Sequence, residues 1–172
     1  MNKFENIITR FNKRIANPNK YDTTYDGYGG YLDEMGVKYV SSKEMCTPHH
    51  PDIASDLGYD AFVPFRDMWD RGGALASVFD HLRADLGKPI VVRNWWRPAD
   101  YNEKVGGAPG SDHVGAYAID MDFKTHDDRR HVERVLEGLY KDPELDMSLG
   151  LGGYTIHMGL CSERGNRRWY YD

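Results

Sequence analysis

Two residues that can bind a metal or move protons lie close together in the segment GSDHVGAYAIDMDF, residues 110–123. His113 and Asp120 are seven positions apart, with small residues between them. The preceding VGGAPGSDH is typical of a loop and AYAIDMDF of a strand, so we expect the histidine at a loop end and the aspartate on a strand. Small residues let the backbone fold back and bring both side chains to one point. A second histidine, His157, follows the glycine-rich GLGG, residues 150–153, and lies in a predicted strand near the C-terminus.

Two imidazoles and one carboxylate are a suitable ligand set for a catalytic zinc ion. They supply three protein ligands and leave a fourth position for water. Such an ion makes hydroxide available near neutral pH. The spacing alone is equally compatible with His113 as a hydrogen-bonded structural residue beside a glycine loop. On the residues alone, both interpretations stay open.

The spacing of apolar residues indicates the elements that must position these side chains. Steps of three and four residues predict the helices, and β-rich or alternating runs predict the strands. Gly72 and Gly73 are a potential break in the second helix. The predicted helices cover 4–16, 65–86, 98–107 and 127–140, and the predicted strands cover 88–92, 117–123, 154–160 and 168–171. Because no regular βαβ alternation is present, we expect an α+β domain with a small, mostly antiparallel sheet and flanking helices.

The length of 172 residues suits one compact domain. Residues 17–36, NPNKYDTTYDGYGGYLDEMG, are rich in turn formers and tyrosine, which is typical of a loop or an extended arm. We therefore divide the chain into an N-terminal helix and tyrosine-rich arm, 1–38, and a main domain, 39–172. We expect the two parts to form one compact unit overall.

Composition excludes several classes of partner. The net charge of −5, without a dense Lys/Arg patch, argues against a nucleic-acid-binding surface. No apolar segment approaches the length of a membrane span, and the charged N-terminus has no signal-peptide core. Cys46 and Cys161 lie far apart without C-x-x-C spacing, so we expect free thiols, with a single bridge as the alternative.

The segment around His113 resembles the pattern S-x-H-x-x-G-x-A-x-D of the zinc D-Ala-D-Ala carboxypeptidase family. This family is related to phage L-alanyl-D-glutamate endolysins and to the Hedgehog signalling domain. Four fixed positions agree, and the fifth, a glycine in the pattern, is Ala116 here. Gly115 could take over the backbone role of that glycine. The matching residues are Ser111, His113, Ala118 and Asp120.

The likeness extends over roughly residues 39–172. LGKPIVVRNWWRPADYNEKVGGAPGSDH resembles the family's strand, its arginine-bearing turn and its approach to the first zinc histidine. YVSSKEMCTP resembles the segment that opens such domains. GLGGYTIHMGL, followed by RRWYYD, resembles the strand that carries the last zinc histidine. The resemblance implies a D,D-peptidase-like fold.

The resemblance also implies roles for individual residues. His113, Asp120 and His157 match the zinc ligands. Arg97 matches the arginine that binds a substrate carboxylate or carbonyl, a task that suits its planar guanidinium; the alternative is a surface ion pair. Ser111 would support the site through hydrogen bonds to its neighbours, or it is a simple turn serine.

The family's general base has no obvious equivalent. Related peptidases carry a carboxylate a few residues before the last zinc histidine, or an aspartate two residues after it, and these places hold Tyr154, Thr155 and Gly159. Glu163 is our candidate for the base that takes a proton from the attacking water. The other candidates are Asp112, Asp122, His49 and His50, and each could equally be a solvated surface residue.

Two functional hypotheses follow. The first is a zinc-dependent peptidase that cuts a D-amino-acid-containing bond in peptidoglycan stem peptides, as a phage-type lysin made in the cytoplasm and released to the cell wall or carried in a virion. The second is a non-catalytic homologue that keeps Zn²⁺ and binds cell wall or a protein partner.

Overall fold

The computed structural model describes residues 17–142, 145–162 and 164–171. The helix predicted over 4–16 lies outside these residues. No helix within the described ranges has the length and apolarity needed to cross a membrane. The elements, in chain order, are η1 (Pro18–Lys20), α2 (Tyr25–Glu34), α3 (Ser42–Cys46), α4 (Pro51–Asp56), η2 (Arg66–Met68), α5 (Trp69–Leu86), β1 (Val91–Asn94), α6 (Ala99–Lys104), β2 (Ala118–Asp122), α7 (His126–Tyr140), β3 (Met147–Leu151), β4 (Thr155–Leu160) and β5 (Arg167–Tyr170).

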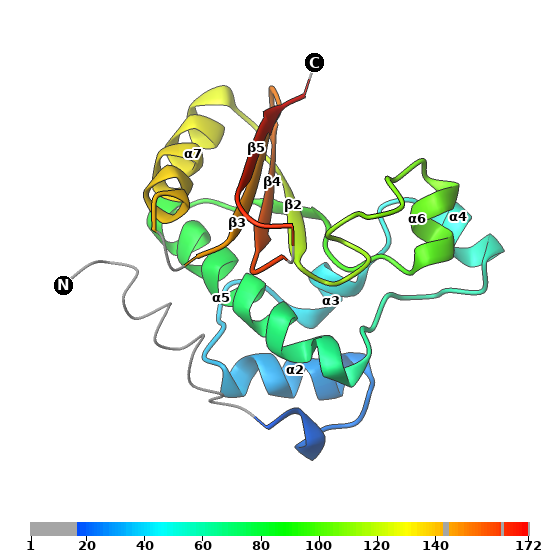
Figure 1. Cartoon of the computed structure of the whole chain (residues 1–172). Coiled ribbons are helices and arrows are strands. Elements are labelled where there is room, and N and C mark those ends of the chain that lie inside the picture. The colour runs from blue at the N-terminus through cyan, green and yellow to red at the C-terminus, as the bar shows by residue number, and fades with distance from the viewer. Residues whose placement is uncertain (1–16, 143–144, 163, 172) are drawn as a thin grey trace.

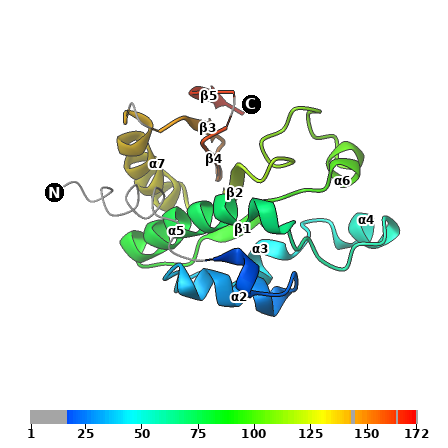
Figure 2. The same ribbon diagram turned by 60° about the horizontal axis from the view of Figure 1, so that its bottom comes forward.

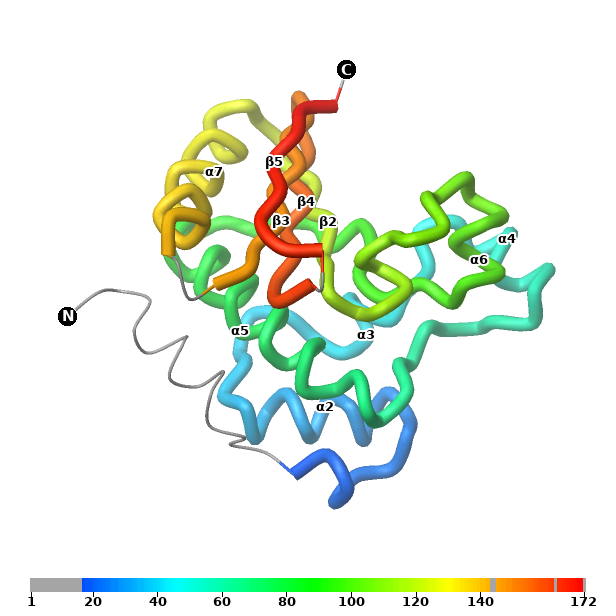
Figure 3. Tube along the Cα trace, viewed as in Figure 1, coloured from blue at the N-terminus to red at the C-terminus, as the bar shows by residue number. Residues whose placement is uncertain are grey.

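The strands form one five-stranded sheet in the order β1-β2-β4-β3-β5. The pairs β1–β2, β2–β4 and β3–β4 are antiparallel, and β3–β5 is parallel. Two views show α7 on one side of the sheet and α4 and α6 on the other (Figures 1 and 2). The C-terminal β5, red in Figure 3, runs beside β3. The predicted α+β class with a mostly antiparallel sheet is confirmed.

The sheet has one core face and one polar face. α5 and α7 contact β4, and α7 also contacts β3. Alternate residues of the two central strands belong to the hydrophobic core: Ile119, Met121, Ile156 and Met158. Because neighbouring side chains of a strand point to opposite faces, Asp120 and His157 project from the other face. The sheet therefore presents both side chains on its polar face.

Helix α5 runs without a break through Gly72 and Gly73. A Cβ at Gly72 would overlap the Trp95 ring and the Tyr28 hydroxyl, so glycine is needed here for close packing rather than for a bend. The helix ends at Gly87, whose φ of 67° gives the left-handed C-cap conformation that glycine adopts without strain. The predicted end of this helix is confirmed.

The expected loop or extended arm over 17–36 is wrong for α2. Thr24 caps this helix by accepting a hydrogen bond from the Gly27 amide, and Tyr28 and Tyr31 are buried. The Tyr28 ring stacks on Trp95 with a centroid distance of 5.8 Å and an interplanar angle of 10°. Burial of these aromatic rings offsets the low helix propensity of the three glycines in α2.

Strand β3 was not predicted, because its sequence, MSLGL, runs into the glycine-rich stretch, which indicates a loop. All five residues are buried. Gly150 pairs with His157 on one side and with Trp169 on the other. A Cβ at Gly150 would lie 2.6 Å from the Trp169 ring, so this strand needs a glycine where the ring crosses it.

Candidate metal centre

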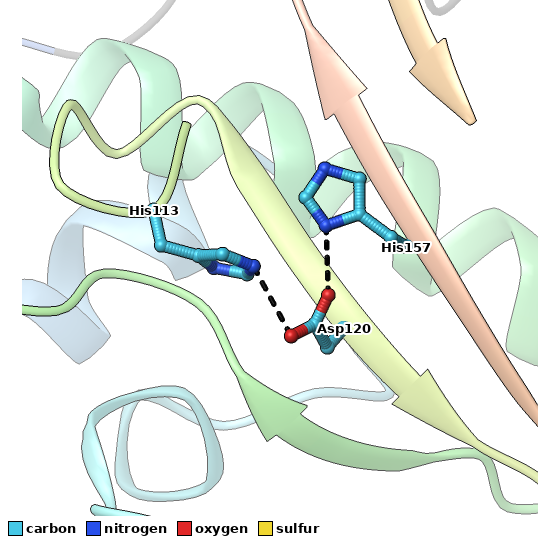
Figure 4. A group of neighbouring side chains, drawn as sticks. All are labelled: His113, Asp120 and His157. Carbon is cyan, nitrogen blue, oxygen red and sulfur yellow. Dashed lines mark hydrogen bonds and ion pairs between the residues drawn. The ribbon is translucent and has the colours of Figure 1, made fainter. Parts of the chain in front are cut away.

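His113, Asp120 and His157 meet on the polar face of the sheet (Figure 4). His113 Nε2 lies 3.1 Å from Asp120 Oδ2, and His157 Nδ1 lies 2.8 Å from Asp120 Oδ1. The potential ligand atoms of the three residues all lie within 4.8 Å of one another. Both histidines are buried. The structure thus brings together the three residues that the sequence predicted as a cluster.

Strand pairing and a tight turn create this arrangement. Asp120 of β2 and His157 of β4 are direct partners in the sheet register. The His113 carbonyl accepts hydrogen bonds from the backbone amides of Arg97 (3.1 Å) and Ala116 (3.2 Å), which fixes the loop before β2. Ala116 itself takes the left-handed φ of 58°, so the expectation that Gly115 would assume this role is wrong. The fully buried Ala116 is held there by packing despite the cost for a non-glycine residue.

The distal nitrogen of each imidazole faces a polar partner away from Asp120. His113 Nδ1 lies 2.6 Å from the Trp95 carbonyl oxygen, an arrangement in which Nδ1 carries the proton and Nε2 is free to accept a metal. His157 Nε2 lies 3.4 Å from Ser148 Oγ and 3.9 Å from Asp112 Oδ2. These contacts turn His113 Nε2 and His157 Nδ1 toward the same point.

Asp112 is the centre of a buried polar network behind His157. Its carboxylate accepts hydrogen bonds from Ser148 Oγ (3.0 Å), Ser162 Oγ (2.8 Å) and the Arg167 guanidinium. Burial raises the pKa of the Asp112 carboxyl, but nearby His157, the hydrogen bonds from the two serines and the Arg167 charge lower it by more, so that the pKa lies below its usual value. Because Asp112 faces the nitrogen of His157 that points away from Asp120, it is placed to orient His157 rather than to act as a base.

The three cluster residues shift one another's pKa values. Burial raises the pKa of Asp120, yet the two histidines lower it to well below the usual carboxyl range. Burial lowers the pKa of His113 more than Asp120 raises it. Burial also lowers the pKa of His157, but Asp112 and Asp120 together raise it above its usual value. Asp120 is therefore ionised, and His157 carries a proton more readily than His113.

The donor set fits a zinc ion. Two ligands bonded to zinc at ~2.0–2.1 Å in tetrahedral geometry lie about 3.3 Å apart. The imidazole nitrogens lie 3.1 and 2.8 Å from the two different oxygens of Asp120, near this value, and the three potential ligand atoms all lie within 4.8 Å of one another. Two imidazoles and one carboxylate are also the ligand types that zinc accepts in catalytic sites.

Arg97 lies beside the cluster in a cleft of about 270 Å³ that His113, Asp120 and His157 also line. Its Nη2 donates to Ser111 Oγ (3.3 Å), and Ser111 Oγ accepts a second hydrogen bond from the His113 amide (3.3 Å). Arg97 Nε is buried without a hydrogen-bond partner. Within the described part of the chain no carboxylate forms an ion pair with Arg97, so this guanidinium can bind an anionic ligand.

The positions beside His157 supply no carboxylate in the described chain. Tyr154 packs against His126 with ring centroids 4.0 Å apart, and Gly159 has no side chain. Glu163, the candidate base, lies outside the described residues. Asp122 shares a sheet face with Asp120 but forms an ion pair with Arg93 at 3.5 Å. His49 and His50 are exposed and pack edge to face against each other, with ring centroids 4.6 Å apart.

Sequence reasoning assigned no role to several residues that complete the site. Trp169 of β5 lies against His157, with ring centroids 5.1 Å apart. Tyr171 lines the cleft beside Asp120, and Ser148 comes from β3. No local motif marks these residues, because strand pairing alone brings them to His157.

An α+β fold with a largely buried His-Asp-His cluster beside an open cleft has the features of a zinc-peptidase domain. The family model for peptidase M15 matches residues 64–158, more than half of the chain and all three cluster residues. The chain therefore belongs to the peptidase M15 family, the zinc D-Ala-D-Ala carboxypeptidase family, whose members act on peptidoglycan. Searches of curated proteins and of solved structures gave no match.

Proposed function

We propose that this protein is a zinc-dependent peptidase that cuts a D-amino-acid-containing bond in peptidoglycan stem peptides. The observation that carries the proposal is the convergence of His113, Asp120 and His157 on one point inside the region that matches peptidase M15. The open cleft beside these residues gives a substrate access to them.

His113 Nε2, Asp120 and His157 Nδ1 would hold the zinc ion, which would supply Lewis-acid polarisation of the scissile carbonyl and a nucleophile near neutral pH. The Trp95 carbonyl and Asp112 keep the two imidazoles in the required orientation. The chain's own residues thereby fix the geometry of the site before substrate arrives.

Arg97 would bind a substrate carboxylate or carbonyl. Its guanidinium faces the same cleft as the three proposed ligands and has no acidic partner there among the described residues. Ser111 Oγ accepts hydrogen bonds from both Arg97 and the His113 amide, so a substrate bound to Arg97 is held in a defined position relative to the metal site. Such positioning accelerates a reaction by holding the scissile bond in attack geometry.

Glu163 is the base that we propose for proton transfer from the attacking water to the leaving amine. It follows β4 by three residues, in the connection to β5. Its substitution by glutamine removes the proton acceptor and keeps the size of the side chain, which makes Glu163→Gln the direct test.

A second function is favoured by one specific observation. Tyr154, Thr155 and Gly159, at the places where related enzymes carry their base, offer no carboxylate. A homologue that retains the metal for folding, and uses the cleft to bind cell wall or a protein partner, would have this feature. Zinc content is the same for both functions, and turnover separates them.

The experiment is digestion of purified peptidoglycan by the zinc-loaded protein, with the released muropeptides analysed by mass spectrometry. A peptidase produces a metal-dependent mass change that identifies the bond, and His157→Ala and Glu163→Gln abolish it. Intact muropeptides from several wall types would instead support the binding function. Normal turnover by Glu163→Gln would reject Glu163 as the base while leaving the peptidase intact.

We further propose that the protein acts as a phage-type lysin, made in the cytoplasm and released to the wall or carried in a virion. Lysis of susceptible cells by added protein, after their outer surface is made permeable, tests this assignment. Cleavage of purified wall without lysis of such cells would argue for a different biological setting.

A further inference from the structure

A second cavity, of about 450 Å³, adjoins the metal-centre cleft, and Arg97 lines both. This volume falls within the roughly 300–1,000 Å³ that small-molecule sites occupy. Most of its lining is aromatic or aliphatic, and Asp100 adds a carboxylate. We call it the Phe65 groove; its apolar lining includes Tyr59, Phe65, Met68, Trp96 and Val114.

The groove exposes apolar surface that a ligand can cover. Phe65 is 64% exposed, although it packs edge to face on Trp96 with ring centroids 5.5 Å apart. The Trp96 ring also packs edge to face against Phe62, with ring centroids 6.4 Å apart. An aromatic wall of this kind favours alkyl chains, and its ring faces also attract cations.

The groove carries a positive charge at Arg97 and a negative charge at Asp100. Asp100 accepts hydrogen bonds from the Tyr59 hydroxyl (3.0 Å) and the Tyr101 amide (2.8 Å), which fix its orientation without neutralising it. Among the residues that the structure describes, no lysine or arginine forms an ion pair with Asp100. Asp100 is also exposed to solvent, so the cationic end of a ligand side chain can reach its carboxylate.

From this geometry we propose that the Phe65 groove binds the alkyl-ammonium side chain of a diamino-acid residue in the stem peptide. A substrate carboxylate on Arg97 anchors the peptide at the boundary of the two cavities. The methylene groups of the neighbouring diamino acid cover Phe65 and Trp96, and its ammonium group reaches Asp100. The inference rests on the proposed function, because it names the substrate residue that the same site selects.

The test compares three stem peptides that differ only at the diamino-acid position, which holds lysine, Nε-acetyl-lysine or norleucine. The zinc-loaded full chain is assayed for kcat/KM by mass spectrometry and, where a peptide is not cleaved, for Kd by titration calorimetry. Asp100→Asn removes the charge and Phe65→Ala removes part of the wall. Asp127→Asn is the matched control, because it changes an exposed carboxylate on α7, on the other side of the sheet (Figure 1).

We expect the wild type to prefer lysine over acetyl-lysine and norleucine by about two- to fivefold, the effect of one partly solvated ion pair. Asp100→Asn abolishes this preference, and Asp127→Asn behaves as wild type. Phe65→Ala lowers kcat/KM, or weakens binding, for all three peptides. Equal values for the three peptides, no measurable affinity for any of them, or a preference that survives Asp100→Asn would overturn the inference. A preserved preference in Kd without any cleavage would refute the peptidase function and leave the groove assignment standing.

Discussion

Neutralising Asp112 tests whether the buried network behind His157 controls the metal site. Asp112→Asn keeps the shape of the side chain but removes the charge that Arg167, Ser148 and Ser162 contact. The amide group also places an N–H donor where the carboxylate offered only acceptors. His157 Nε2 then no longer faces a negative charge, and the His157 imidazole loses one of the interactions that orient its ring.

The size of the effect follows from the burial of the network. Loss of one partner of a fully buried ion pair costs about 3–5 kcal/mol, and each charged hydrogen bond contributes about 1.5–3 kcal/mol. The Arg167 side chain is 27% exposed, so water partly solvates the guanidinium charge that Asp112 no longer pairs with. The asparagine of the variant also retains one acceptor oxygen. We expect a loss of about 2–3 kcal/mol in the free energy of unfolding, and a 10–100-fold loss of zinc affinity, roughly the range found for groups that orient metal ligands.

The assay is urea unfolding of the metal-free protein combined with zinc titration against a competing chelator. Ser162→Ala is the control, because it removes one hydrogen bond to Asp112 but leaves its charge opposite His157. It should cost about 1 kcal/mol and leave zinc affinity nearly unchanged. Unchanged zinc affinity in Asp112→Asn, despite lower stability, would refute the orienting role. No change in either quantity would refute the network itself.

Three further outcomes are expected. Zinc affinity should fall about tenfold per pH unit below the raised pKa of His157, because zinc binding must displace the proton of this imidazole. Competition with a chelator between pH 6 and 8 measures the zinc affinity, and an affinity that does not change with pH contradicts the prediction. Arg97→Lys should lower kcat/KM about 10–100-fold without changing zinc affinity, because lysine loses the two-point contact with a carboxylate; an equal kcat/KM would exclude Arg97 from substrate binding. Gly159→Ala should cost about 1–3 kcal/mol in urea unfolding, because its Cβ would overlap Ser148 Oγ and lie 3.3 Å from Asp112 Oδ2; Gly153→Ala, with only His126 at 3.8 Å, is the control and should be tolerated.

The proposed ligands could be predicted because the motif around His113 and the isolated His157 have recognisable residue types and spacing. The structure places them together since β2 and β4 are neighbours in the sheet, with Asp120 opposite His157. The amphipathic helices, with alternating or apolar strands between them, likewise carry periodicities that are visible locally.

Elements that depend on long-range packing could not be predicted. The glycines and tyrosines of α2 indicate a loop until Tyr28 is seen stacked on Trp95. β3 runs into a glycine-rich stretch that indicates a loop, and Gly150 is explained only by the Trp169 ring across it. The role of Asp112 depends in the same way on partners up to 55 residues away in sequence.

The most direct test of the account is zinc K-edge X-ray absorption spectroscopy of the protein loaded with one equivalent of Zn²⁺. The structure predicts two imidazole nitrogens and light oxygen donors at about 2.0–2.2 Å, with no sulfur ligand. The signal should change in His113→Ala, Asp120→Ala and His157→Ala. Sulfur scattering at ~2.3 Å from a cysteine, or an unchanged spectrum in all three variants, would contradict the His113–Asp120–His157 centre.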